Sequence, residues 1–337
     1  MRKWFTCLTY LLLLTGMLAG CKRIELYELT TKVKINFNID LDIDVDLDMK
    51  ADTKLDPEFA AKVDGVMPEY MQVIFYDSKT NRMQASFILP ASGGEVDIRP
   101  GDYHIVAYNF GTNSTQTDYV SVMDDALAFT TEITKSMASK LNAQTARETR
   151  GYEDDPIIYE PDHLYVANEK NINVPSVLNY NEEVTIYTTA STILDVYSLE
   201  VLGVTGCENI EKVEAFITGQ IKNNRFGIEE RGTDPATLYV TLKPDAQNNR
   251  LYTVFGTFGK LPFADNKVYL DITVTDTGGG QYRYVYDVTD QFDDEKNVNN
   301  KLVIIEEIDI PEGNIGGGGL APGVQDWDNE SVDIPLC

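Results

Sequence analysis

The chain has 337 residues, of which 54 are acidic and 28 are lysine or arginine, and its formal net charge at pH 7 is −26. A surface this acidic repels phosphate backbones and anionic lipid headgroups, which argues against a nucleic-acid partner and against membrane docking through a basic patch. The length predicts two domains, each large enough to bury its own core without disulfides.

The N-terminus carries a positive pair, Arg2 and Lys3, followed by an apolar run from Trp4 to Met17. This run is short for a membrane-spanning helix and has the form of a signal peptide. It ends in the pattern of a bacterial lipobox, formed by Leu18, Ala19, Gly20 and Cys21. We therefore expect residues 1–20 to be removed and Cys21 to be acylated, with each buried methylene of the acyl chains contributing about 0.8 kcal/mol to membrane binding.

Apolar and polar residues alternate from Val33 to Met49, which predicts one long, half-buried strand. The polar positions include five alternating aspartates, Asp40, Asp42, Asp44, Asp46 and Asp48. A calcium ion needs about six to eight oxygen ligands from several directions, which a single straight strand cannot supply. We interpret the aspartates as a solvated face that discourages edge pairing. A divalent-ion site completed by another segment stays open as the alternative.

Further strand signals in the first half lie at 71–76, 86–89, 95–98 and 103–108. Short turns such as Ser92-Gly93-Gly94 separate them, so the strands are predicted to form antiparallel sheets. From Asp124 to Gln144 the apolar spacing is partly helical, which predicts one helix. The polar segment at 145–155 is interpreted as a loop or linker.

The second half repeats the strand pattern at 183–187, 193–202, 213–218, 238–242, 252–258, 267–275, 282–288 and 301–308. Gly278-Gly279-Gly280 joins two alternating segments and predicts a hairpin turn, where positive φ carries no steric cost. We expect a lipidated N-terminus and tether at 21–31, an N-terminal β-sandwich domain at 32–165 and a C-terminal β-sandwich domain at 166–337.

The C-terminal segment begins with four glycines, Gly316 to Gly319, which predict a flexible hinge. Residues 324–337 beyond it are interpreted as a detachable terminal strand, which Trp327 would anchor to the body. Cys207 and Cys337 are the cysteines left for a disulfide in an oxidising compartment, and whether they pair stays open.

The sequence contains few residues or motifs that indicate catalysis. His104 and His163 are its two histidines, and neither has a histidine or cysteine at metal-ligand spacing. The sequence has no Gly-x-Ser-x-Gly elbow and no His-Glu-x-x-His helix. The alternating tyrosines at 282, 284 and 286 are interpreted as sheet face or core. We therefore predict no catalytic site, no metal, no cofactor and no enzymatic activity.

Several local motifs resemble one family. Pro100–Asn109 is similar to a turn and strand in the N-terminal domains of the fimbrillin-like lipoproteins of Bacteroides and relatives, which supply stalk, anchor and tip subunits of type V pili. Four segments of the second half are similar to a subfamily of unknown function: 197–203, 213–219, 255–259 and 286–290. The resemblance implies an all-β fold of two tandem transthyretin-like antiparallel β-sandwich domains. It also implies that stalk subunits polymerise by adding a strand to the next subunit.

The chain departs from a stalk subunit after its first predicted strand, where proteolytic maturation would open the groove. Lys50 and Lys54 are the basic residues nearest to that point, and Arg147 and Arg150 come much later. An anchor or accessory role therefore fits at least as well as a stalk role.

The resemblance also implies a location and partners. It implies a lipid-anchored outer-membrane protein at the cell surface, whose partners are the membrane, through its lipid, and other pilus subunits. The segment Lys22-Arg23-Ile24-Glu25 lacks a dense acidic cluster, so the periplasmic face stays open. A tethered protein that binds surface glycans or another ligand without polymerising is the alternative function.

Overall fold

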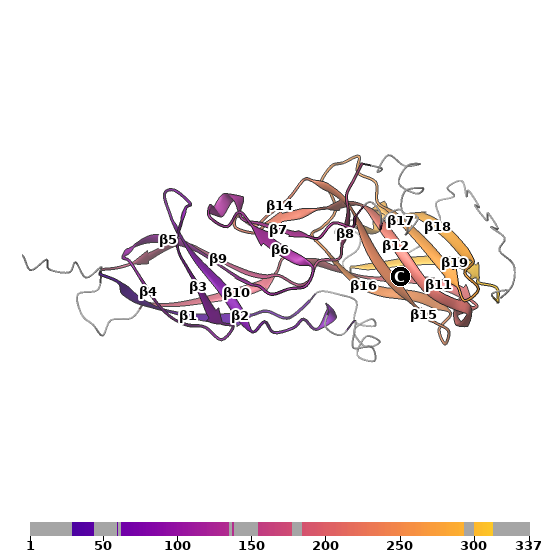
Figure 1. Cartoon of the computed structure of the whole chain (residues 1–337), viewed down its shortest axis with the longest axis horizontal. Coiled ribbons are helices and arrows are strands. Elements are labelled where there is room, and N and C mark those ends of the chain that lie inside the picture. The colour runs from indigo at the N-terminus through magenta and orange to yellow at the C-terminus, as the bar shows by residue number, and fades with distance from the viewer. Residues whose placement is uncertain are drawn as a thin grey trace, which may run out of the picture.

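The computed structural model describes residues 29–43, 59, 62–134, 137, 154–176, 184–292 and 300–312. Within these residues nearly all regular structure is β: nineteen strands and three short 3₁₀ helices. The predicted all-β class is therefore confirmed. The molecule is elongated, with one sheet at its left end and a larger sheet at its right end in Figure 1. No helix of the described residues is long and apolar enough to cross a membrane.

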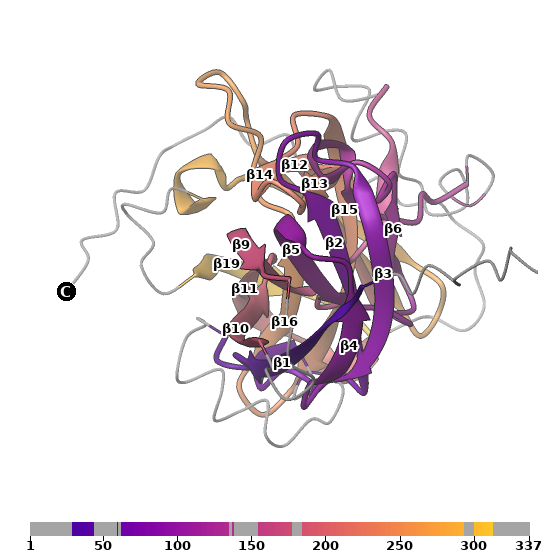
Figure 2. The same cartoon turned by 90° about the vertical axis from the view of Figure 1, so that its left-hand side faces the viewer.

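The first sheet has seven strands in the order β3-β2-β5-β9-β10-β1-β4. Their bounds are β1 Thr31–Ile39, β2 Tyr70–Asp77, β3 Met83–Pro90, β4 Gly94–Ile98, β5 Gly101–Asn109, β9 Tyr165–Val174 and β10 Val184–Thr192. The register between β9 and β10 covers only two residue pairs, Val166 with Ser191 and Tyr165 with Thr192. The sheet folds over at this short junction, so that β1 and β10 lie below β5 and β9 in the end-on view of Figure 2.

The two layers of this sheet enclose one apolar core. Alternate residues of β1, Val33 and Ile35, meet Val73 and Phe75 of β2 there. Each buried side chain of this size contributes about 1.5–3 kcal/mol relative to an exposed one. The opposite face of β2 is also buried, at Ile74 and Tyr76, which belong to a separate cluster. Burial on both faces explains why β2 has a continuous apolar run instead of strict alternation.

The expected boundary between the two domains, at 165/166, falls at the start of β9, which belongs to the first sheet. Because β9 pairs with β5, and β10 pairs with β1, the first sheet extends to Thr192. The sequence between Tyr165 and Thr192 alternates weakly, so its partners are set by contacts with distant strands and not by a local pattern.

The second sheet forms a sandwich in the order β18-β17-β12-β15-β16-β11-β19, with β8 paired to β15. The bounds are β8 Ile157–Tyr159, β11 Asp195–Thr205, β12 Ile210–Ile221, β15 Pro235–Asp245, β16 Arg250–Thr257, β17 Tyr269–Asp276, β18 Gln281–Asp287 and β19 Lys301–Asp309. The strand β15 pairs with β12 up to Leu242 and with β16 from Lys243 onwards. A strand that changes sheet in this way makes a closed corner, which leaves β18 and β19 at the two ends of the strand order.

The predicted hairpin at Gly278-Gly279-Gly280 joins β17 to β18. The Asp276 carboxylate accepts the backbone N–H groups of Gly278 and Gly280 at 2.8 and 2.7 Å, and Gly279 has a φ of +84°. These acceptor contacts lower the pKa of Asp276 from its ordinary value. The prediction of this turn is confirmed.

A small sheet joins the two halves of the chain. Its order is β14-β13-β7-β6, and its strands are β6 Thr115–Asp118, β7 Leu127–Thr130, β13 Asn223–Arg225 and β14 Glu230–Arg231. It lies between the two larger sheets in Figure 1. Beneath it, Tyr108 of the first sheet packs edge-on against Phe226, with ring centroids 4.9 Å apart. The junction therefore has a core of its own.

The helix predicted from Asp124 to Gln144 is wrong over its first part. The structure has a 3₁₀ helix, Met123–Asp125, followed by β7. Ala128 of β7 is fully buried and pairs with Thr117 on one side and Asn224 on the other. These pairings across the junction outweigh the partly helical spacing. Most residues from 135 to 144 lie outside the described part of the chain.

Candidate functional site

Most of the predicted site residues lie outside the described residues. They are Leu18, Ala19, Gly20 and Cys21 of the lipobox, the terminal Trp327, and Asp44, Asp46 and Asp48. Their roles therefore remain predictions. Cys207 is a buried free thiol, and its proposed partner Cys337 also lies outside these residues.

The remaining two aspartates do not continue the first strand, and this part of the prediction is wrong. The strand β1 ends at Ile39, and the Asp40 carboxylate accepts the backbone N–H of Asp42 at 3.0 Å. A side chain that accepts the backbone N–H two residues later in this way competes with the sheet ladder and favours a turn. Among the described residues, no three carboxylate, histidine or cysteine side chains gather as a metal site would require.

The second sandwich has two edge strands, β18 and β19, each with a single partner among the described strands. An edge strand presents backbone groups to which another chain can add a strand. The two edges belong to opposite layers of the sandwich. Burial is the main cause that raises the pKa of Tyr284 and Tyr286 on β18, and the nearby charge of Glu306 on β19 is a smaller cause. The two edges therefore flank the open side of this sandwich.

The edge of β19 is interrupted. Its register with β11 shifts between Leu202 and Val204, where Glu306 and Glu307 stand opposite Gly203 alone. Gly203 has a φ of +86°, and a Cβ there would lie 2.2 Å from the Glu306 carbonyl oxygen. A bulge with exposed acidic side chains is a common protection against edge pairing.

The edge of β18 is regular, since all seven of its residues pair with β17 without a shift. Its three tyrosines pack against the core on one face, and Val285 lies on the other face. The Arg283 guanidinium bonds both carboxylate oxygens of Asp271, at 2.8 and 2.7 Å. Of the two edges, β18 is the better template for an added strand.

A polar cluster fixes the two sandwiches to each other. The Lys62 ammonium donates to Glu160 at 2.6 Å and to the Val254 carbonyl at 3.0 Å. The other Glu160 oxygen accepts the Gly256 N–H at 2.9 Å. Burial raises the pKa of Glu160, against the opposing effect of Lys62. His163 contacts the Lys62 carbonyl at 3.0 Å, and burial lowers its pKa.

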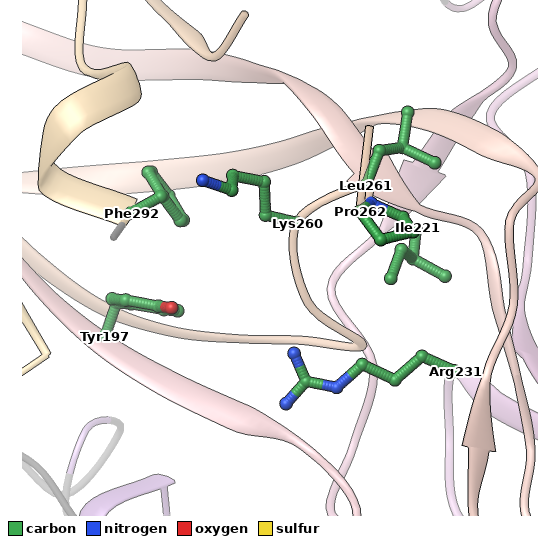
Figure 3. Close-up of a pocket in the computed structure, with 7 residues that line it drawn as sticks. All are labelled: Tyr197, Ile221, Arg231, Lys260, Leu261, Pro262 and Phe292. Atoms are coloured by element: carbon green, nitrogen blue, oxygen red, sulfur yellow. The ribbon is translucent and has the colours of Figure 1, made fainter. Parts of the chain in front are cut away.

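Two hollows lie beside this junction and share Arg231. The first, here the aromatic hollow, has a volume of about 230 Å³ and is lined by Tyr197, Ile221, Arg231, Lys260, Leu261, Pro262 and Phe292. Figure 3 shows Arg231 and Lys260 reaching it from different sides, with Tyr197 and Phe292 at one end. The second, of about 290 Å³, lies between β9, β10 and the small sheet, where Asn168 and Asn224 contribute to its wall.

Sequence reasoning missed the residues of both hollows, because no local motif marks them. Tyr197, Arg231 and Lys260 come from three separate segments, and the alternation of their strands carries no information about a shared cavity. The strongly acidic composition also did not predict a cavity lined by two basic side chains.

The fold and these features define the class: an all-β protein of two sandwiches joined through a shared small sheet. The chain belongs to the family described as a domain of unknown function, DUF5119, whose model matches residues 49–241. The predicted membership of a family of unknown function is confirmed.

Relatives with descriptive names come from Bacteroides and Porphyromonas. A candidate fimbrium anchoring subunit, Fim4B of Bacteroides ovatus, is 27% identical over 114 residues, which are 33% of this chain and 30% of that protein. The match thus spans less than a third of the relative's length.

Two solved structures extend the comparison. A candidate adhesin from Bacteroides ovatus ATCC 8483 has a TM-score of 0.56 and 19% identity, and the similarity covers 88% of this chain and 98% of that one. The fimbrial anchor protein Mfa2 from Porphyromonas gingivalis has a TM-score of 0.47 and 11% identity, over 82% and 90% of the two chains. At such identities the first similarity establishes a shared fold.

Proposed function

We propose that this protein is a lipid-anchored component of the cell envelope that serves as an anchor or accessory subunit of a fimbrium. In this proposal Cys21 carries the lipid and the protein lies in the outer membrane. Its role involves no catalysis. The local match to a candidate fimbrium anchoring subunit and the fold shared with a candidate adhesin support this role.

The observation that carries the proposal is the regular, singly paired edge of β18. A partner subunit adds a strand there, with backbone hydrogen bonds supplying affinity and alternate side chains supplying register. The protected edge of β19 directs the partner to β18. The terminal segment 324–337 is the detachable strand that this chain offers to another subunit once it has left the chain's own body.

The anchor is tested by Cys21→Ala. We expect the variant to lose labelling by a radioactive fatty acid and to leave the membrane fraction. Labelled protein that persists after this substitution would exclude Cys21 as the lipid attachment site.

The fimbrial role is tested on cells by electron microscopy of sheared surface material with an antibody against this chain. We expect labelled filaments, and labelling confined to membrane fragments would argue against the role.

The edge of β18 is tested with Val285→Lys, which places a charge beside this edge, opposite Asp271. We expect fewer attached filaments.

The matched control is Ile305→Lys on the bulged edge of β19, where the side chain is 65% exposed and the charge is readily solvated. We expect this control to keep normal filament attachment. Equal loss in both variants would remove the preference for β18.

A further inference from the structure

The aromatic hollow combines two cations with an apolar interior on a strongly acidic chain. Its described lining residues include the guanidinium of Arg231 and the ammonium of Lys260, and no carboxylate. Tyr197 and Phe292 stand at one end, with ring centroids 4.7 Å apart. In Figure 3 the Lys260 ammonium lies beside the Phe292 ring, and the Arg231 guanidinium points into the same space from below.

Both cations are positioned by the local fold. Arg231 donates to Asp195 at 2.7 Å, and Gly259 allows the guanidinium to approach, because a Cβ at this glycine would lie 2.6 Å from its Nη1 atom. Lys260 follows directly in the chain, and its ammonium has no bonding partner among the residues that the structure describes. The hollow therefore presents one partnered and one available cation around an apolar space.

An occupant with matching chemistry has a large apolar group with carboxylates on both sides. The chain contains this combination once beyond its last described strand, as Asp326-Trp327-Asp328. An indole ring buries about 150–250 Å² and attracts cations to its face. The segment from 313 to 337 holds no lysine or arginine, so its charge is opposite to that of the hollow.

The covalent connection is long enough. The described chain ends at Glu312, near Ile310, whose N–H donates to Thr205 at the end of β11. Tyr197 lies eight residues back along this strand, at about 26 Å. The fifteen residues from Glu312 to Trp327 span up to about 50 Å when extended.

We infer that the aromatic hollow is the docking site for the chain's own Asp326-Trp327-Asp328 segment. The indole of Trp327 fills the space between Tyr197 and the two cations, and the flanking carboxylates pair with Lys260 and Arg231. This contact gives the predicted anchoring role of Trp327 a specific partner, and it holds whether or not the chain joins a fimbrium.

The test uses Trp327 fluorescence in the full chain carrying Trp4→Phe, so that Trp327 is the single tryptophan. We expect emission at the short wavelengths of a buried indole and weak quenching by acrylamide. Lys260→Glu should shift the emission to longer wavelength and raise the quenching constant severalfold. A charge exchange that combines Lys260→Glu with Asp326→Lys should restore part of the wild-type emission.

The matched control is Lys79→Glu, an equal change of charge on an exposed turn of the first sandwich. We expect it to leave the emission unchanged. Circular dichroism of each variant checks the fold, and a chain lacking 324–337 should bind a synthetic peptide of residues 320–336 that the same chain with Lys260→Glu does not bind.

Three results would overturn the inference. An exposed-type emission in the parent chain means that the indole is not docked. An emission that Lys260→Glu does not alter means that it docks elsewhere. An emission that changes on dilution, together with a dimer in size-exclusion chromatography, assigns the segment to the hollow of a second copy.

Discussion

Lys62, which precedes β2, donates to the carboxylate of Glu160, which precedes β9, at 2.6 Å. The same ammonium reaches the Val254 carbonyl of the second sandwich at 3.0 Å. One side chain thus connects three segments that are about a hundred or more residues apart in sequence. The two sandwiches are held by a polar contact at this point and by apolar packing around it.

Removing this cation should weaken the junction. We expect Lys62→Met to lower the free energy of unfolding by about 1–3 kcal/mol, less than the roughly 3–5 kcal/mol of a fully buried pair because both side chains are partly exposed. Urea unfolding followed by circular dichroism measures this change. Lys32→Met is the control, since its pair with Glu95 is about half exposed and its loss should change stability by about 0.5 kcal/mol or less. Equal effects would show that Lys62 is an ordinary surface residue.

His163 should make stability depend on pH. Burial lowers its pKa below 6.5, so the unfolded chain binds a proton there more readily than the folded chain. Stability from this group is therefore complete above pH 6.5 and decreases as pH falls from 6.5 towards the folded-state pKa. We expect His163→Gln to lose less stability than the parent between pH 7.5 and 5.5. Taking the difference between the two chains removes the opposing contribution of Glu160, and parallel pH profiles would contradict this assignment.

The bulge opposite Gly203 should depend on a glycine. Gly203→Ala combines an unfavourable φ with a contact of 2.2 Å to the Glu306 carbonyl, so we expect a loss of about 2–4 kcal/mol. Gly111→Ala is matched, because Gly111 has a φ of +80° with nothing within 4 Å, and it should cost about 1 kcal/mol. Thermal unfolding of the two variants separates the clash from the backbone conformation. A Gly111 effect as large as that of Gly203 would mean that Glu306 can move away.

Arg250 should contribute less to stability when the Glu200 carboxylate is removed. It is 9% exposed, it donates to Asp245 at 3.0 Å, and it also bonds Glu200. Arg250→Leu leaves Glu200 with Lys301, at 3.1 Å, as its remaining cation, so the cost should be at or below the lower end of the roughly 3–5 kcal/mol of an uncompensated buried charge. Adding Glu200→Leu should recover part of that loss in a double-mutant cycle measured by urea unfolding. Strictly additive effects would show that the two side chains do not interact energetically.

Local pattern was sufficient for much of the fold. The alternation at 213–218 and 267–275, and the glycines at 278–280, predicted β12, β17 and the turn to β18, because period two and turn chemistry act over a few residues. The strand β9 was missed, since its middle residues are half-exposed and Asn171 has a φ of +59°. The helix predicted at 124–144 was wrong over its first part because the burial of Ala128 depends on β13, nearly a hundred residues later.

The candidate sites were less accessible to sequence reasoning. The aspartate series appeared continuous because alternation cannot report that the Asp40 carboxylate accepts the backbone N–H of Asp42 where the strand ends. The aromatic hollow brings together Tyr197 of β11, Arg231 of β14 and Lys260 of the segment between β16 and β17. Such a meeting depends on the tertiary register, which no spacing within one segment encodes.

The small sheet has a consequence for how the chain acquires its structure. Its strands β6 and β7 belong to the first half and β13 and β14 to the second, so neither half can complete it. Without Phe226, Tyr108 and its neighbours on the first sandwich lack the part of their cover that the second half supplies. An N-terminal half on its own therefore exposes part of this apolar cluster, and the stability of each sandwich depends in part on the other.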